Sequence, residues 1–93
     1  MELTEIQSLQ EQYGFKDLQD NINSGIVWKM EGSQGRAAMG AIEAGACMLG
    51  EEPKRDYYGN RIPARSEVQE GTKGSFQNSV NFWSNPENYE NFL

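Results

Sequence analysis

Basic and aromatic side chains gather in one stretch of an otherwise acidic sequence. Residues 54–74, KRDYYGNRIPARSEVQEGTKG, contain two adjacent tyrosines and five of the eight basic residues, namely Lys54, Arg55, Arg61, Arg65 and Lys73. Guanidinium groups form paired hydrogen bonds with phosphate or carboxylate, and aromatic rings offer faces to flat or charged groups. Long loops without a pattern of their own are usually functional or disordered. We therefore predict a binding surface for a flat or anionic ligand.

The candidate ligand contacts in this stretch have a competing structural explanation. The dipeptide Gly59-Asn60 is a turn signal that would spread the flanking side chains. The arginines could hold a ligand, or they could pair internally with Glu51, Glu52 or Asp56 while the tyrosines cover a small core. The candidates are Arg55, Tyr57, Tyr58, Asn60, Arg61 and Arg65, with Lys73 as a further cation that also fits a turn within Gly71-Thr72-Lys73-Gly74.

A second candidate site lies at Gly32-Ser33-Gln34-Gly35-Arg36, where a helix is predicted to begin. The first backbone N–H groups of a helix lack partners within it and attract phosphate, and glycine lets a ligand approach closely. Ser33, Gly35 and Arg36 are therefore candidate ligand contacts. The alternative is an ordinary helix start capped by Ser33. The spacing differs from that of the phosphate-binding loop of ATPases, so no ATPase is implied.

The residues that most enzymes use for nucleophilic chemistry are scarce. The sequence has no histidine and a single cysteine, Cys47. Their scarcity excludes Ser-His and Cys-His nucleophile pairs and a cysteine-based zinc site. The carboxylates do not follow the spacing of a calcium-binding loop. We therefore expect a protein that is not an enzyme and that needs neither a metal nor a cofactor.

The charge balance restricts the class of partner. The formal net charge is −6, and residues 1–35 carry six acidic residues against two basic ones. Nonspecific binding to a nucleic-acid backbone needs a broad basic face, so direct nucleic-acid binding is not expected. A small anionic ligand held in a local site, or a host protein that meets the acidic surface, remains open as a partner.

The apolar periodicity predicts a mainly α fold, a small single domain of about three helices. Helices are expected over residues 2–12, 16–22 and 36–49, the last capped by Ser33 and ended by Gly50. Residues 26–28 are either a short strand or a buried connector. Residues 61–63 and 66–68 could be extended, which leaves room for a short two-stranded element within a long ordered Gly/Arg/Tyr loop. The domain divides into an acidic helical segment (1–25), a central helix (26–50), a basic and aromatic loop (51–75) and an aromatic, Asn-rich tail (76–93).

Small and aromatic residues predict how these parts pack. Small residues repeat along the predicted central helix, and its two glycines at positions 40 and 45 suit close packing of another backbone. That partner is either the core of the same chain or a second copy in a homodimer, which a small core would favour. A further helical turn or two is expected from Ser75 to Trp83. In the tail, Phe82, Trp83 and either Tyr89 or Phe92 are expected to dock on the domain.

The sequence also predicts a location in the cell. A lone cysteine indicates a reducing cytoplasm, and the polar, acidic N-terminus does not resemble a signal peptide. The longest run of low charge, residues 37–50, is too short to cross a bilayer. We expect no association with a membrane.

Several short motifs resemble a group of small bacteriophage proteins. The similarity covers roughly residues 21–78 and implies an accessory protein made in the infected bacterium, acting in the host cytoplasm. It implies no particular activity. The motifs are Trp28-Lys29-Met30-Glu31-Gly32-Ser33-Gln34-Gly35-Arg36, Arg55-Asp56-Tyr57-Tyr58-Gly59-Asn60, Pro63-Ala64-Arg65-Ser66-Glu67-Val68 and Gly71-Thr72-Lys73-Gly74-Ser75.

The residues and the resemblance together predict a phage-encoded, non-enzymatic binding protein that interferes with host processes or defence. In the first version it sequesters a small phosphorylated signal of the nucleotide type between Arg36 and the basic loop. In the second it is an acidic inhibitor that binds a host defence protein or nuclease through residues 1–35 and the aromatic tail. In the third it is a structural or assembly protein of the virion.

Overall fold

The structure, a computed structural model, describes residues 1–29 and 32–92, with Phe92 described in its backbone only. Two sequence-based expectations therefore lie outside the described residues. One is the part of the phage-like motif formed by Met30 and Glu31, and the other is the docking of the Phe92 side chain.

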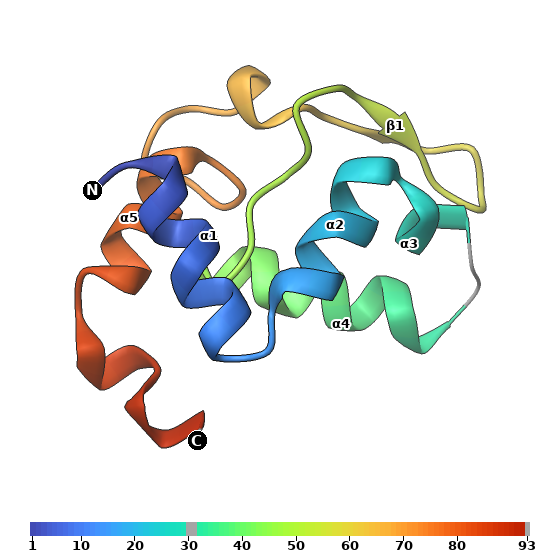
Figure 1. Ribbon diagram of the computed structural model, residues 1–93. Helices are drawn as coiled ribbons and strands as arrows, with labels where there is room; N and C mark the ends of the chain where they lie inside the picture. The colour runs from blue at the N-terminus through green and yellow to red at the C-terminus, as the bar shows by residue number, and fades with distance from the viewer. Residues whose placement is uncertain (30–31, 93) are drawn as a thin grey trace.

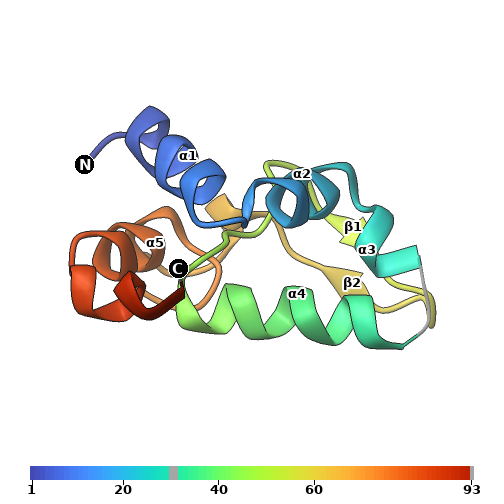
Figure 2. The ribbon, with the colours of Figure 1, turned by 60° about the horizontal axis from the view of Figure 1, so that its bottom comes forward.

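The described chain is mainly helical with one small antiparallel sheet, which confirms the predicted fold class. The first three helices follow one another across one side of the molecule, and α4 runs along the opposite side (Figures 1 and 2). The α-helices are α1 (Leu3–Gln12), α2 (Lys16–Ser24), α3 (Ile26–Lys29), α4 (Ser33–Ala44) and α5 (Phe76–Trp83). The 3₁₀ turns are η1 (Arg65–Glu67), η2 (Pro86–Asn88) and η3 (Glu90–Phe92), and the strands are β1 (Lys54–Arg55) and β2 (Arg61–Ile62).

The strands form a short hairpin inside the predicted loop. Lys54 pairs with Ile62 and Arg55 with Arg61. Local pairing therefore orders the stretch, and the short two-stranded element exists, but only one of the predicted extended pieces takes part in it, at Arg61 and Ile62. Ser66 and Glu67, also expected to be extended, belong to the 3₁₀ turn η1 instead. None of the helices in the described part of the chain has the length and apolar character needed to cross a bilayer.

The central helix is shorter and less buried than the sequence suggested. It begins at Ser33, with Gly32 rather than Ser33 in the capping position, and it ends at Ala44 instead of Leu49. Gly45 ends it in the left-handed conformation, φ 101°. A side chain there would also meet the backbone oxygen of Asn78 at 2.8 Å, because α5 crosses the helix end at this point. The expected close backbone partner is thus α5 at Gly45.

Only one side of α4 is buried. Ala38 and Ile42 are in the interior, whereas Ala37, Gly40 and Ala44 are exposed. Among the described residues, no atom outside the neighbouring helix backbone lies within 4 Å of the position that a side chain on Gly40 would occupy. Self-association through this exposed face stays a prediction. The stretch from residue 26 to residue 28, predicted as a strand or a connector, begins α3 instead.

The interior has two cores. The hairpin-side core contains Ile22, Val27, Trp28, Ala38, Ile42, Cys47 and Leu49. The tail-side core contains Ile6, Ala46, Met48, Phe82, Trp83 and Tyr89. The burial of Phe82, Trp83 and Tyr89 confirms that the tail aromatics dock on the domain.

Residues 45–50 run between the two cores as buried, non-helical chain, and we call them the crossing segment. Successive side chains of the segment alternate between the two cores. Ala46 and Met48 accordingly join the tail-side core, and Cys47 and Leu49 join the hairpin-side core. The crossing segment therefore contributes side chains to both cores and joins them.

Polar side chains satisfy the backbone of the crossing segment, as buried peptide groups require. Gln19 bonds both sides of Met48: its Oε1 accepts from the backbone N–H at 2.8 Å, and its Nε2 donates to the carbonyl at 2.9 Å. Four further side-chain donors serve the segment's carbonyls: Ser79 to Gly45 at 2.6 Å, Gln10 to Ala46 at 3.0 Å, Trp83 to Ala46 at 3.2 Å and Arg65 to Leu49 at 2.8 Å.

Candidate functional site

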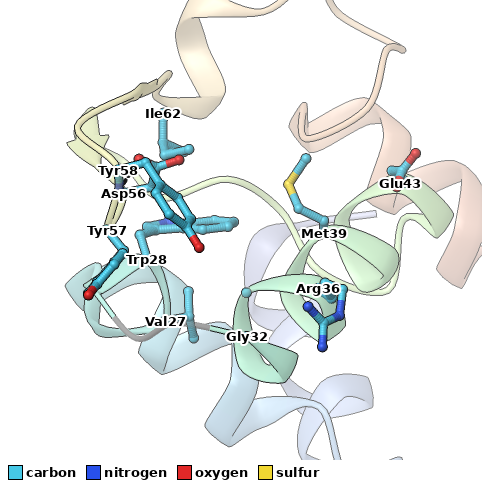
Figure 3. A pocket seen from close by; sticks show the side chains of 11 residues that line it. Val27, Trp28, Gly32, Arg36, Met39, Glu43, Asp56, Tyr57, Tyr58 and Ile62 are labelled. Carbon is cyan, nitrogen blue, oxygen red and sulfur yellow. Dashed lines mark hydrogen bonds between the residues drawn. The ribbon is translucent and has the colours of Figure 1, made fainter.

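A pocket of about 460 Å³ opens between the β1–β2 hairpin, α3 and the beginning of α4. Figure 3 shows aromatic side chains on one side of the opening and the Arg36 and Met39 side chains of α4 on the other. The residues that line it are Val27, Trp28, Gly32, Gly35, Arg36, Met39, Glu43, Asp56, Tyr57, Tyr58 and Ile62. We call it the head pocket.

One face of α4 forms a wall of the head pocket. Arg36, Met39 and Glu43 recur at intervals of three and four residues, and Gly35 lies four residues before Met39, which places them on one side of the helix. Arg36 stands at the end of the first turn of α4 and donates its backbone N–H to the Gly32 carbonyl. The N–H groups of the residues just before it, from Ser33 to Gly35, have no acceptor within the helix. The capping residue, Gly32, has a positive φ of 96° and no side chain that could cover this end.

Aromatic rings form the opposite wall. Trp28 belongs to the hairpin-side core, is only 5 % exposed and presents part of its surface to the pocket. Tyr57 and Tyr58 stand at the tip of the hairpin and are 57 % and 70 % exposed. Their ring centroids lie 5.1 Å apart at an interplanar angle of 81°. The two tyrosines thus meet edge to face and remain accessible to a ligand on their outer surfaces.

The hairpin tip is held in shape by Asp56. Its Oδ1 accepts hydrogen bonds from the backbone N–H groups of Tyr58 at 2.9 Å and Asn60 at 2.8 Å. Gly59 has a positive φ of 84°, which allows the tight turn. The tyrosine pair is therefore presented by an organised turn.

Arg36 is the only cation among the described residues that line the head pocket. The two acidic residues of the lining have other partners. Glu43 forms an ion pair with Lys73 at 2.9 Å, and the carboxylate of Asp56 is engaged by backbone donors. Arg36 and the positive end of the α4 dipole are therefore the positive features of the pocket, while Glu43 and Asp56 leave the formal charge of its lining at −1.

The structure brings together four of the predicted contact residues: Gly35, Arg36, Tyr57 and Tyr58. Ser33 is exposed at the first position of α4 and does not line the pocket. The remaining predicted residues have partners inside the protein. Arg55 donates to the Gly59 carbonyl at 2.9 Å, Asn60 bonds Asp56, Arg61 pairs with Glu67 at 2.7 Å, Arg65 donates to Leu49, and Lys73 pairs with Glu43.

These partners favour the structural explanation for the arginines of the loop, although they are not the carboxylates that the sequence suggested. Arg65 is half buried, and burial lowers its pKa from the ordinary value while the charge of Glu51 acts in the opposite direction. The pKa of Glu67 is lowered chiefly by the hydrogen bond from the Ala64 backbone and further by Arg61. The arginines of the loop therefore do not converge on a common site.

Sequence reasoning missed most of the walls of the head pocket. Val27, Trp28, Met39, Glu43, Asp56 and Ile62 line it without having been candidates. The helical spacing from Arg36 to Met39 and Glu43 was a signal that could have identified one wall. No comparable signal marked Trp28, because a buried tryptophan next to a turn is ordinary core.

Comparison of the chain with protein-family models, with curated proteins and with solved structures found no match.

Proposed function

We propose that this protein is a non-enzymatic binding protein for a small molecule that combines a flat ring with one terminal phosphate monoester. The observation that carries the proposal is the head pocket itself, in which an aromatic wall faces a single arginine at a helix N-terminus. The ring would lie against Trp28 and the tyrosines, and the phosphate would lie at Arg36 and the first turn of α4.

Charge matching supports a single phosphate over a longer phosphate chain. A phosphate monoester carries about −1.5 to −2 at neutral pH. Arg36 contributes one positive charge, and a helix N-terminus is equivalent to roughly +0.5. These charges suffice for one monoester, whereas a di- or triphosphate would bring several further negative charges beside Glu43 and Asp56.

The resemblance to small bacteriophage proteins supplies the biological setting of the proposal. In an infected bacterium, a protein with this pocket would sequester a nucleotide-type compound and so interfere with a host process or defence. Mononucleotides fit the proposed chemistry because they combine a flat base with a terminal phosphate.

The test is calorimetric titration and thermal shift with phenyl phosphate and nucleoside monophosphates, beside the matching nucleosides and inorganic phosphate. A ligand that binds only the folded protein raises its melting temperature. Arg36→Ala should weaken binding about tenfold or more, since charge-assisted hydrogen bonds contribute roughly 1.5–3 kcal/mol. Lys29→Ala removes an exposed cation outside the pocket and is the matched control. Equal affinities in the two variants would contradict the proposed phosphate site.

A second candidate function is an acidic inhibitor of a host protein, favoured by the exposed carboxylates of the first two helices. Glu2, Glu5, Glu11, Asp17 and Asp20 are all exposed on or beside α1 and α2. Phe82, Trp83 and Tyr89 of the tail cannot share this role as folded, because they are buried. Glu11→Gln combined with Asp17→Asn should abolish the effect on the host in this case, while Arg36→Ala should preserve it.

A further inference from the structure

A second, smaller cavity adjoins the head pocket. Its volume is about 220 Å³, and it shares Met39, Glu43 and Ile62 with the head pocket. We call it the tail cavity. Its lining is Met39, Ile42, Glu43, Leu49, Ile62, Pro63, Val68 and Lys73.

The walls of the tail cavity are aliphatic. Ile42 and Leu49 come from the hairpin-side core, and Ile62 and Val68 pack against that core. The charged lining residues, Glu43 and Lys73, form an ion pair with each other at 2.9 Å and are largely exposed. The cavity therefore presents hydrocarbon, and its lining charges are already paired with each other.

The backbone around the tail cavity preserves its shape. Gly74 has a positive φ of 90°, and a side chain on it would come within 2.5 Å of Leu49 Cδ1. Its carbonyl also accepts a hydrogen bond from the Leu49 backbone N–H at 3.1 Å. Glycine at this position lets the neighbouring backbone approach Leu49 and fixes one wall of the cavity.

Water is a poor occupant of such a space. An ordered water needs two to four polar partners, and apolar cavities offer too few. Displacing loosely held water by an apolar group gains affinity. Met39 lines both cavities, is 45 % exposed and has an unbranched, adaptable side chain. It can therefore move aside for a chain that passes from one cavity into the other.

We propose that the tail cavity receives an aliphatic chain carried by the ligand of the head pocket, so that the ligand class is an amphipathic anion with a flat head. This inference rests on the proposed function, since it assigns a second part of the same ligand. The phosphate lies at Arg36, the ring lies against Trp28 and Tyr58, and the chain passes Met39 toward Val68.

A homologous series of 4-alkylphenyl phosphates, from phenyl phosphate to 4-butylphenyl phosphate, tests the inference by calorimetry. In the wild type, affinity should rise about fourfold per added methylene until the tail cavity is filled, as expected for burial of hydrocarbon. Val68→Phe should abolish this rise, because the larger side chain would fill the tail cavity. It should leave the affinity for phenyl phosphate within about twofold of the wild-type value, because Val68 lines the tail cavity and not the head pocket. Val80→Phe, at a partly buried valine of the tail-side core, is the matched control and should keep the rise.

Each outcome decides one of the two proposals. If phenyl phosphate binds but affinity does not rise with chain length, the tail inference is wrong and the head pocket stands. If affinity rises equally in the wild type and Val68→Phe, the chain binds elsewhere and the inference is also wrong. If no member of the series binds, the proposed function fails together with the inference. Should Val68→Phe not fold, as judged by circular dichroism, Val68→Met fills the cavity with a more adaptable side chain and is read by the same criteria.

Discussion

Replacing Gln19 by leucine should destabilise the protein more than almost any other single polar-to-apolar change. The side chain is 5 % exposed and holds both the N–H and the carbonyl of Met48 in the crossing segment. It also accepts a hydrogen bond from Gln10 at 3.0 Å. Leucine has a similar volume and would fill the space, so the effect isolates the lost hydrogen bonds.

The expected magnitude follows from the groups left without partners. Each buried polar group that loses its hydrogen bond costs roughly 1–3 kcal/mol. The N–H and carbonyl of Met48 together give about 2–5 kcal/mol after partial relaxation. A domain of this size has a total stability of about 5–15 kcal/mol, so the variant would lose a large part of it. In thermal terms, each 1 kcal/mol corresponds to roughly 4–8 °C of melting temperature.

Urea denaturation followed by far-ultraviolet circular dichroism and tryptophan fluorescence measures this loss. The matched control is Gln7→Leu, which makes the same chemical change at an exposed position of α1. Surface substitutions of this kind stay within about 0.5 kcal/mol of the wild type. If Gln19→Leu also stayed within that range, the hydrogen bonds would not support the crossing segment, and our account of the fold would be refuted.

Three further predictions concern stability and reactivity. Arg65→Ala should lower the free energy of unfolding by about 1–3 kcal/mol, because the Leu49 carbonyl loses its donor. The affinity for phenyl phosphate should stay unchanged. If binding were lost while stability stayed at the wild-type value, Arg65 would belong to the ligand site. Gly40→Ala should raise the free energy of unfolding by about 0.5–1 kcal/mol, since the surroundings of Gly40 are open. Gly14 is equally open but has φ 85°, so Gly14→Ala should lower the free energy of unfolding by about 1–2 kcal/mol. If Gly40→Ala were less stable and more monomeric in light scattering, a dimer interface would lie at Gly40 instead. Burial raises the pKa of the Cys47 thiol to about 12, so little thiolate forms at pH 8 and alkylation by iodoacetamide should follow unfolding in urea; fast alkylation of the native protein would contradict its burial.

The local elements were predictable from the sequence because they depend on neighbouring residues. The apolar spacing located α1, α2 and the start of α4 to within a few residues, and Ser75 marked the start of α5, where its hydroxyl accepts from the Asn78 backbone. The end of α4 was not predictable from local pattern. Residues 46–49, Ala-Cys-Met-Leu, suit a helix, and contacts with α5 and with the distant side chains of Gln10, Gln19 and Arg65 make the non-helical course favourable.

The candidate site was predictable only in part, for a similar reason. Residue type indicated that arginine and tyrosine could hold a ligand, and the fold does place Tyr57, Tyr58 and Arg36 around one pocket. Residue type could not reveal which arginines are already bonded to backbone or to Glu67, since those partners are set by the tertiary fold. The aliphatic walls carried no chemical signal at all.

The two cores differ in when a ribosome can complete them. The buried members of the hairpin-side core all lie between residues 22 and 49, whereas the tail-side core joins Ile6 to Trp83 and Tyr89. A chain emerges from its N-terminus during synthesis, so α1 is made well before Phe82, Trp83 and Tyr89, which complete its core. Until these aromatics are made, α1 can pack only on α2 and on the Ala46 and Met48 side chains, and part of its apolar side stays open to water and to chaperones.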